Sequence, residues 1–473
     1  MNRKSAKSLC KKLFTGLIIA CMACTITACG ENTTETENSN TVSAQSQTEG
    51  VFIESKSNDR YEYDVYSNHV EITKYTGDET KVEIPSEIDG KPVTSIGKYT
   101  FSIHSSYLLK NYSPYENCGL ITEITVPDSI ITIGEGAFFG CTSLKNITVP
   151  NGVTSIENYT FADCSSLTGI NISDNVKSIG ERAFSGCIAL ADITIPENTT
   201  TIGEYVFEGC TALENITFSD NVISVGAYAF DDTKWYSNQS DGLIYIGKSA
   251  YKYKGNMAEN TDIVLKDGTK EISAYAFMDC TYLTGITIPD SVTNIGSCAF
   301  ENCTSLTSVV IPDGIEVIES FVFCECTSLT DVDIPDSVTA VNGGAFFGCT
   351  SLVKIDLPEG MTSLGYSAFE NCTALEDITI PDKVTILEDY TFSGCKALTD
   401  IDIPDGVTTV KGGAFYECTK LKSAAIPESV TNIAKNAFVD ENGEPLSKLT
   451  IYGKSGSYAE EYADYKNIPF EEV

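Results

Sequence analysis

The stretch Cys141-Thr-Ser-Leu144-Lys-Asn-Ile147-Thr-Val149-Pro150-Asn-Gly-Val153-Thr-Ser-Ile156-Glu-Asn-Tyr-Thr-Phe161-Ala-Asp-Cys164 decides the fold, because its pattern recurs along most of the chain. The phenylalanine returns every 23 residues from Phe138 to Phe230, and again from Phe277 to Phe438. A repeat of this length indicates stacked units, each of which buries its apolar face only against its neighbours. The sequence therefore predicts an elongated solenoid.

Within one unit, apolar residues alternate ahead of a proline. Ile147 and Val149 flank the outward-facing Thr148, which predicts a short strand that ends at Pro150, because proline cannot donate to a sheet ladder. Val153 and Ile156 are expected to return to the core from the opposite side. The Ala-Phe-x-x-Cys segment is expected to form a helical or 3₁₀ turn. The predicted fold class is an α/β leucine-rich-repeat solenoid with short parallel strands. Backbone freedom at the tight corner is expected from glycine at Gly134, Gly180, Gly203 and Gly226.

The pattern Cys-Thr-Ser-Leu-x-x-Ile-x-Ile-Pro-Asp-x-Val-Thr-x-Ile-Gly-x-x-Ala-Phe-x-x-Cys resembles the repeat of the BspA-like leucine-rich-repeat family of bacterial surface proteins. The resemblance covers about residues 80 to 440. It implies a right-handed, arc-shaped solenoid and, for some members, adhesion to host extracellular-matrix proteins or to other cells. The resemblance thus predicts the fold more sharply than the function.

Changes in period and composition divide the chain. We expect a lipoprotein signal peptide at 1–28, a disordered tether at 29–50, an N-terminal cap at 51–80, repeats at 81–230, a β-hairpin insertion at 231–265, repeats at 266–440 and a C-terminal cap at 441–473. Alternating apolar residues at 61–65 and 70–72 predict a β-hairpin in the first cap, and Ser457 opens a short helix in the second. A 14-residue loop after Phe101 carries His104, Tyr107, Tyr112 and Tyr115.

The first residues have the features of an export signal. Five basic residues precede the apolar run 13–20, and Ile26-Thr27-Ala28-Cys29 follows. This tetrapeptide resembles the lipobox of bacterial lipoproteins, which implies cleavage before Cys29 and lipidation of that cysteine; ordinary secretion with an incidental cysteine is the alternative. Residues 30–50 are polar and lack aromatic residues, as in a flexible tether. We therefore expect the protein on the extracellular side of a bacterial membrane, held by lipid alone.

The chain is strongly acidic, with 31 basic against 66 acidic residues and a net charge of −35. Removal of residues 1–28 would take away five basic residues and leave 26 against the same 66. A field of that sign opposes nucleic acid and favours basic partners or divalent cations. We expect no nucleic-acid partner, although colloidal stability of an exported protein is a simpler reason for the charge.

Twelve cysteines keep the 23-residue spacing. They are Cys118, Cys141, Cys164, Cys187, Cys210, Cys280, Cys303, Cys326, Cys349, Cys372, Cys395 and Cys418. Metal ligation has little support, because these twelve form no Cys-x-x-Cys pair and the chain has only two histidines. Stacked units would bring the Cα atoms within disulfide range but with parallel Cβ vectors, so buried free thiols are preferred. Cys298 and Cys324 fall outside this spacing and are expected to be exposed. A disulfide between the two, or from one of them to another chain, is the alternative to free thiols.

Two sets of residues are candidates for ligand binding. The insertion gathers the aromatic residues Trp235, Tyr236, Tyr245, Tyr251 and Tyr253. Such clusters are typical interface anchors, while sealing of a broken stack is the alternative. Outward strand positions in the C-terminal half, expected on the concave face, gather Asp331, Asp333, Asp356, Asp377, Asp400 and Asp402. These carboxylates suit Ca²⁺ or a basic peptide, and a solvated mixed face is the alternative.

These features favour a lipid-anchored surface protein that binds an extracellular protein, glycoprotein or cell-surface glycan. A structural, self-associating envelope protein without an external ligand is the alternative. We expect a monomer, and no enzyme, cofactor or catalytic residue, because the chain has no Gly-x-Ser-x-Gly motif, phosphate loop or His-Glu-x-x-His motif.

Overall fold

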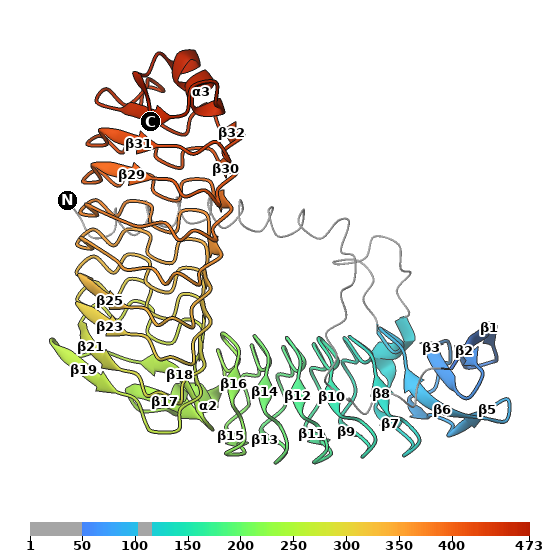
Figure 1. Cartoon of the computed structure of the whole chain (residues 1–473). Helices are drawn as coiled ribbons and strands as arrows, with labels where there is room; N and C mark the ends of the chain where they lie inside the picture. Colours follow the sequence, from blue (N-terminus) through green and yellow to red (C-terminus); the bar gives the residue numbers. More distant parts are fainter. Residues whose placement is uncertain (1–49, 103–115) are drawn as a thin grey trace. The chain divides into compact units, whose positions relative to one another are not determined.

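Two columns of very short parallel strands run along the repeats, and most units contribute one strand to each column (Figure 1). The computed structural model describes residues 50–102 and 116–473, and Gly50–Val473 form one compact unit. The loop residues His104, Tyr107, Tyr112 and Tyr115 lie outside the described residues, as do Cys29, the signal peptide and the tether up to residue 49.

The first column holds the strand that precedes the proline of each unit. Ile147 lies opposite Ile170 of the next unit, and the central residue of most of these strands is buried between two exposed ones. The predicted strand and its alternation are therefore confirmed. The strands of this column are β4 (Lys81–Glu83), β7 (Glu123–Thr125), β9 (Asn146–Thr148), β11 (Gly169–Asn171), β13 (Asp192–Thr194), β15 (Asn215–Thr217), β19 (Thr261–Val264), β21 (Leu283–Thr287), β23 (Ser308–Val310), β25 (Asp331–Asp333), β29 (Asp400–Asp402), β31 (Ser423–Ala425) and β33 (Thr450–Gly453).

The second column was not predicted as strand. Ile156 lies in the core as expected, but it also pairs in parallel with Ile179, which pairs with Ile202. The strands of this column are β6 (Lys91–Ile96), β8 (Thr132–Ile133), β10 (Ser155–Ile156), β12 (Ser178–Ile179), β14 (Thr201–Ile202), β16 (Ser224–Val225), β20 (Glu271–Ile272), β22 (Asn294–Ile295), β24 (Val317–Ile318), β26 (Ala340–Val341), β27 (Ser363–Leu364), β28 (Ile386–Leu387), β30 (Thr409–Val410) and β32 (Asn432–Ile433).

Additional elements lie at the two ends of the repeat array. At the N-terminus, β1 (Phe52–Ser57), β2 (Tyr61–Tyr66) and β3 (Val70–Tyr75) pair antiparallel, β3 joins β6 in parallel, and β5 (Glu87–Ile88) forms a hairpin with β6. The C-terminus adds α3 (Tyr458–Lys466) and β34 (Phe470–Glu472), and a 3₁₀ helix, η1 (Glu116–Leu120), lies within the array between β6 and β7. The role of these ends as caps stays a prediction.

The Ala-Phe-x-x-Cys segment is not helical, so the predicted α/β class is corrected to a mainly β solenoid with few helices. Successive amides alternate: Ala162 N donates to Tyr159 O of its own turn, whereas Phe161 N and Asp163 N donate to the next unit. Tyr159 and Asp163 both have φ near 58°, in the left-handed region. Two such residues per unit interrupt any helix, because L-residues propagate only the right-handed form.

The corner glycines are needed for close approach rather than for an unusual φ. A Cβ at Gly226 would lie 2.4 Å from the amide nitrogen of Glu204, and one at Gly203 would lie 2.7 Å from that of Glu181. Neither glycine has a positive φ, so the expected conformational role is wrong at these positions. Backbones of adjacent units touch here, and only hydrogen fits between them.

The phenylalanines of the repeat stack ring on ring through the core. From Phe101 to Phe230, and from Phe277 to Phe438, neighbouring ring centroids lie 4.8–5.7 Å apart. All these rings are fully buried. The core is divided into two clusters that meet at Ala250 and Tyr251, where the phenylalanine column is interrupted.

The fourteen cysteines of the described residues are all buried and free, which confirms the predicted thiol column. The Cys164 thiol lies 3.2 Å from the carbonyl oxygen of Phe138, and nine more cysteines make the equivalent bond. Cys298 and Cys324 are only 7% and 8% exposed, so the expectation that they are exposed is wrong. Burial raises the pKa of the Cys118 and Cys418 thiols to about 12.

Replacement of one ring in the column should be costly. Phe207→Ala removes a ring that contacts Phe184 and Phe230, and should lower the free energy of unfolding by about 3–5 kcal/mol in chemical denaturation. Phe52→Ala is the matched control, because Phe52 is 52% exposed and lies outside the column. Equal losses for the two variants would contradict a stabilising role for the column.

Thiol reactivity provides a second check of the fold. Because thiolates are the reactive species and the described thiols are buried, none of the fourteen should react with a water-soluble disulfide reagent in native protein. With Cys10, Cys21, Cys24 and Cys29 replaced by serine, so that only these fourteen remain, all fourteen should react after denaturation, when counted by absorbance. Rapid native labelling of Cys298 or Cys324, identified by mass spectrometry, would show that the turns that hold these two cysteines open in the native protein.

Candidate binding surfaces

The predicted β-hairpin is present, but it belongs to the stack. β17 (Gly242–Ile246) and β18 (Ser249–Lys254) pair antiparallel. β18 then pairs in parallel with β20, with Ala250 opposite Ile272, so it occupies a place in the second strand column. Tyr253 N donates to Ala276 O, as the repeat phenylalanines do to the residue before the next phenylalanine. The hairpin is therefore a modified unit rather than a protruding insertion.

The five aromatic residues of this unit point into the structure. Tyr251 is 1% exposed and its hydroxyl accepts a hydrogen bond from Phe230 N, so it cannot contact a ligand in the folded protein. Trp235 and Tyr236 are half-buried against one core cluster, and Tyr245 and Tyr253 against the other. These contacts fit the alternative in which the rings seal the gap in the phenylalanine column.

Lysine side chains fasten the same unit. Lys254 Nζ donates to the main-chain carbonyls of Tyr236, Ser237 and Gln239 at the end of α2 (Lys234–Asn238). The Lys252 ammonium lies 3.4 Å from Asp231 and 4.9 Å from the Tyr228 ring centroid. A cation at the C-terminal end of a helix is favourable. These bonds hold the hairpin against α2, which disfavours a mobile binding loop.

Between β16 and β18, which do not pair as strands, a buried carboxylate accepts a backbone hydrogen bond from β16. Val225 N, at the end of β16, donates to Glu271 Oε1 at 3.1 Å instead of to a main-chain oxygen of β18. The Glu271 carboxylate is 5% exposed and also receives bonds from Ser273 and Asn294. The sequence pattern gave no signal for this contact, because it depends on the altered spacing of two units.

The six aspartates form an exposed strip on four consecutive units. Asp331 and Asp333 flank buried Val332 in β25, and Asp400 and Asp402 flank buried Ile401 in β29. In the two units between them, the outward positions are Lys354, Asp356, Asp377 and Thr379. A parallel bridge joins Lys354 to Asp377. We call these eight outward positions, with their six carboxylates and one ammonium, the aspartate strip.

The charges of the aspartate strip are only partly compensated. Lys354 Nζ lies 2.8 Å from Asp356 Oδ1, and the Asp356 side chain remains 86% exposed. Hydroxyl hydrogen bonds from Ser423 and Thr399 lower the pKa of Asp400. Lys354 was not predicted as a site residue, although its ion pair with Asp356 lies within a single unit. Within the described residues, no group of three acidic, histidine or cysteine side chains converges to hold a metal ion.

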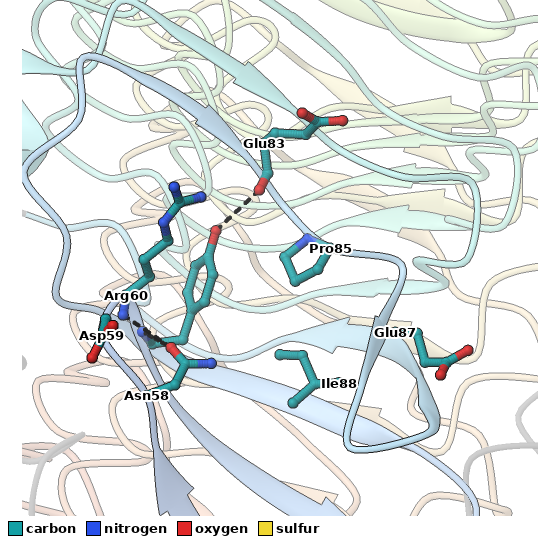
Figure 2. Close-up of a pocket in the computed structure, with 8 residues that line it drawn as sticks. Asn58, Asp59, Arg60, Glu83, Pro85, Glu87 and Ile88 are labelled. Atoms are coloured by element: carbon teal, nitrogen blue, oxygen red, sulfur yellow. Dashed lines mark hydrogen bonds between the residues drawn. The ribbon is translucent and has the colours of Figure 1, made fainter.

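A further hollow lies at the N-terminal end of the described structure (Figure 2). It is a cavity of about 440 Å³ between the β1–β2 turn and the segment from Glu83 to Ile88. The Tyr61 hydroxyl donates to Glu83 O, and the Arg60 guanidinium is paired with Glu79 at 2.9 Å. Figure 2 shows the carboxylates of Glu83 and Glu87 turned away from each other. The hollow therefore lacks polar groups that converge on a ligand.

Stacked units with inward leucine, isoleucine and phenylalanine define the class of this chain as a leucine-rich-repeat solenoid. The family model "BspA type Leucine rich repeat region" matches residues 109–236, 244–344 and 316–444 in six copies. The chain belongs to this family of BspA-type leucine-rich-repeat proteins. No curated protein matches the chain.

Solved structures of bacterial leucine-rich-repeat proteins are similar to the chain. One is a leucine rich cell surface protein from Faecalibacterium prausnitzii, with 27% identity and a TM-score of 0.35 over 87% of this chain and 97% of that one. A leucine-rich repeat protein from Bacteroides ovatus has 25% identity and a TM-score of 0.40, over 88% and 99%. The pneumococcal vaccine antigen PcpA has 15% identity and a TM-score of 0.34, over 89% and 98%.

Proposed function

We propose that this chain is a bacterial cell-surface binding protein whose aspartate strip recognises a basic segment of an extracellular protein. The observation that carries the proposal is the run of six exposed aspartates on four consecutive units, with one lysine among the eight outward positions. Adjacent units are about 4.8 Å apart, so the strip extends over roughly 14 Å. Such a row of like charges attracts a partner that carries several cations.

Exposed valines beside the strip favour a peptide over a bare metal ion. Val310 lies in the unit before the strip, opposite Asp333, and is 64% exposed. Val353, next to Lys354, is 46% exposed. Lysine and arginine have apolar stems that pack on such surfaces while their charged groups reach carboxylates. Ca²⁺ would instead need about six converging oxygens, which the outward-facing aspartates do not provide.

A protein ligand is also favoured over a glycan. The eight outward positions of the aspartate strip hold no aromatic residue. Sugar rings are held largely by stacking on aromatic side chains, and the aromatic residues of the hairpin unit are committed to the core. The strip thus offers charge and short apolar side chains, which match a lysine- or arginine-rich segment.

Neutralisation of the strip tests this function. Asp333→Asn, Asp356→Asn and Asp402→Asn together should weaken binding of a synthetic lysine- and arginine-rich peptide about tenfold at physiological salt, measured by calorimetry, because exposed ion pairs contribute about 0.2–1 kcal/mol each.

The matched control changes three exposed aspartates outside the strip, Asp128→Asn, Asp174→Asn and Asp220→Asn. It has the same net charge as the strip variant and should keep nearly all of the peptide affinity. Equal weakening in the two triple variants would show that only the overall charge attracts the peptide, and would overturn the proposed site.

The same proposal places the protein at the outer face of the membrane through lipid on Cys29. Support comes from the basic and apolar segments and the Ile26-Thr27-Ala28-Cys29 sequence. Among the described residues, no helix has the length and apolar composition that a bilayer span requires. Two or more acyl chains would suffice for stable attachment.

Cys29→Ser should abolish incorporation of radiolabelled fatty acid and release the protein from the membrane fraction into the medium. Cys24→Ser, which changes a neighbouring cysteine, is the control and should leave both properties unchanged. Retention of the label in the Cys29→Ser protein would place the lipid elsewhere and contradict the proposed anchor.

A further inference from the structure

The first described strand, β1, is exposed along its whole length. All six residues from Phe52 to Ser57 are exposed, and β1 pairs with β2 on one side only, at the edge of its sheet (Figure 1). Val51, Phe52 and Ile53 form an apolar run that is 75%, 52% and 52% exposed. No described strand pairs with its outer edge. A free edge with exposed apolar residues is a template for pairing with another chain.

The backbone groups that β1 presents at this edge follow from its hairpin. Asn58 N donates to Tyr61 O at 2.9 Å and closes the turn. Hydrogen-bonded pairs alternate along an antiparallel ladder, so Lys56 and Glu54 bond inward to Tyr63 and Val65. Ser55 and Ser57 therefore direct their N–H and C=O groups outward. A bulge between Phe52 and Glu54 shifts this alternation at the start of the strand.

We infer that the outer edge of β1 pairs antiparallel with β1 of a second copy of this chain, about a two-fold axis at Ser55. In this register Ser55 lies opposite Ser55 of the second copy, and Glu54 lies opposite Lys56 of the second copy. The sequence Glu54-Ser-Lys56 is therefore complementary to itself. Opposite charges across a ladder stabilise the pair.

Symmetric registers with the axis at Glu54 or Lys56 are less favourable. An axis at Glu54 would place two glutamates opposite each other, and an axis at Lys56 would do the same with two lysines. Like charges in directly opposite positions destabilise a ladder. In the register with the axis at Ser55, Glu54 of the second copy would lie near Lys56. The Lys56 ammonium already lies 3.0 Å from Asp89 and 3.1 Å from Glu54 of its own chain, so it would then have three carboxylates around it.

The pairing is short, so it forms a weak dimer. The bulge limits regular pairing to about five residues, and interfaces below about 1,200 Å² are transient. Confinement of copies to one surface would raise their effective concentration. This inference replaces the sequence-based expectation of a monomer, and it does not depend on the aspartate strip.

Cysteine cross-linking tests the register. The background replaces Cys10, Cys21, Cys24 and Cys29, the cysteines outside the described residues, by serine. Ser55→Cys should then form a disulfide-linked dimer, because facing Cα atoms in a hydrogen-bonded pair lie about 5.5 Å apart. Ser57→Cys is the control, since its two copies would be about 14 Å apart. Equal cross-linking of both variants, or none of Ser55→Cys, would overturn the inference.

Charge exchange provides a second readout. In the Ser55→Cys background, Glu54→Lys makes both positions basic and Lys56→Glu makes both acidic, so each variant alone should cross-link at least about fivefold less. An equimolar mixture should restore a heterodimer, identified by mass, since every lysine then faces a glutamate. Unchanged cross-linking of either single variant, or failure of the mixture, would overturn the pairing, and circular dichroism confirms that each variant is folded.

Discussion

The return of the chain to the same place every 23 residues is the constraint on which the structure depends. It brings each phenylalanine ring onto the next at 4.8–5.7 Å and aligns the two strand columns. The same spacing sets a thiol against the main-chain carbonyl of the phenylalanine in the preceding unit. It also forces glycine where backbones meet, as at Gly226. A single unit would not be stable alone, because neighbouring units accept hydrogen bonds from its backbone N–H groups and cover its apolar face.

Inward positions could be predicted from the sequence because the repeat reports them directly. Ile147, Phe161 and Cys164 recur with identical chemistry, and all are buried. The second strand column was missed because two residues such as Ser155 and Ile156 are too few to show alternation. The left-handed residues were missed for another reason. Their positions hold Tyr, Asp, Arg and Gly in different units, so conformation is fixed by hydrogen bonds between units rather than by residue type.

Irregular parts were harder to predict, because their contacts depend on where the stack places them. The hairpin strands were recognised, but the aromatic residues of that unit could equally have been surface anchors. The structure shows that Tyr251 fills the place where the phenylalanine column is interrupted and that Lys254 binds the end of α2. Cys298 was expected at the surface because it breaks the thiol spacing. It is buried because it lies against Tyr275 and Glu301.

In a solenoid, only the side chains and backbone groups that do not pack or pair between units are available to bind a partner. Outward strand positions are one such place, since β25 can carry two aspartates around buried Val332 without any change in the core. The ends of the stack are the other, because the last strand has a neighbour on one side only. At the C-terminus, the edge strand β34 has only three residues, whereas at the N-terminus β1 presents six exposed residues. Water satisfies the backbone donors at an exposed sheet edge, and a second strand can replace that water by pairing with them. The asymmetry between the two ends is therefore the physical reason to expect association at β1 rather than at β34.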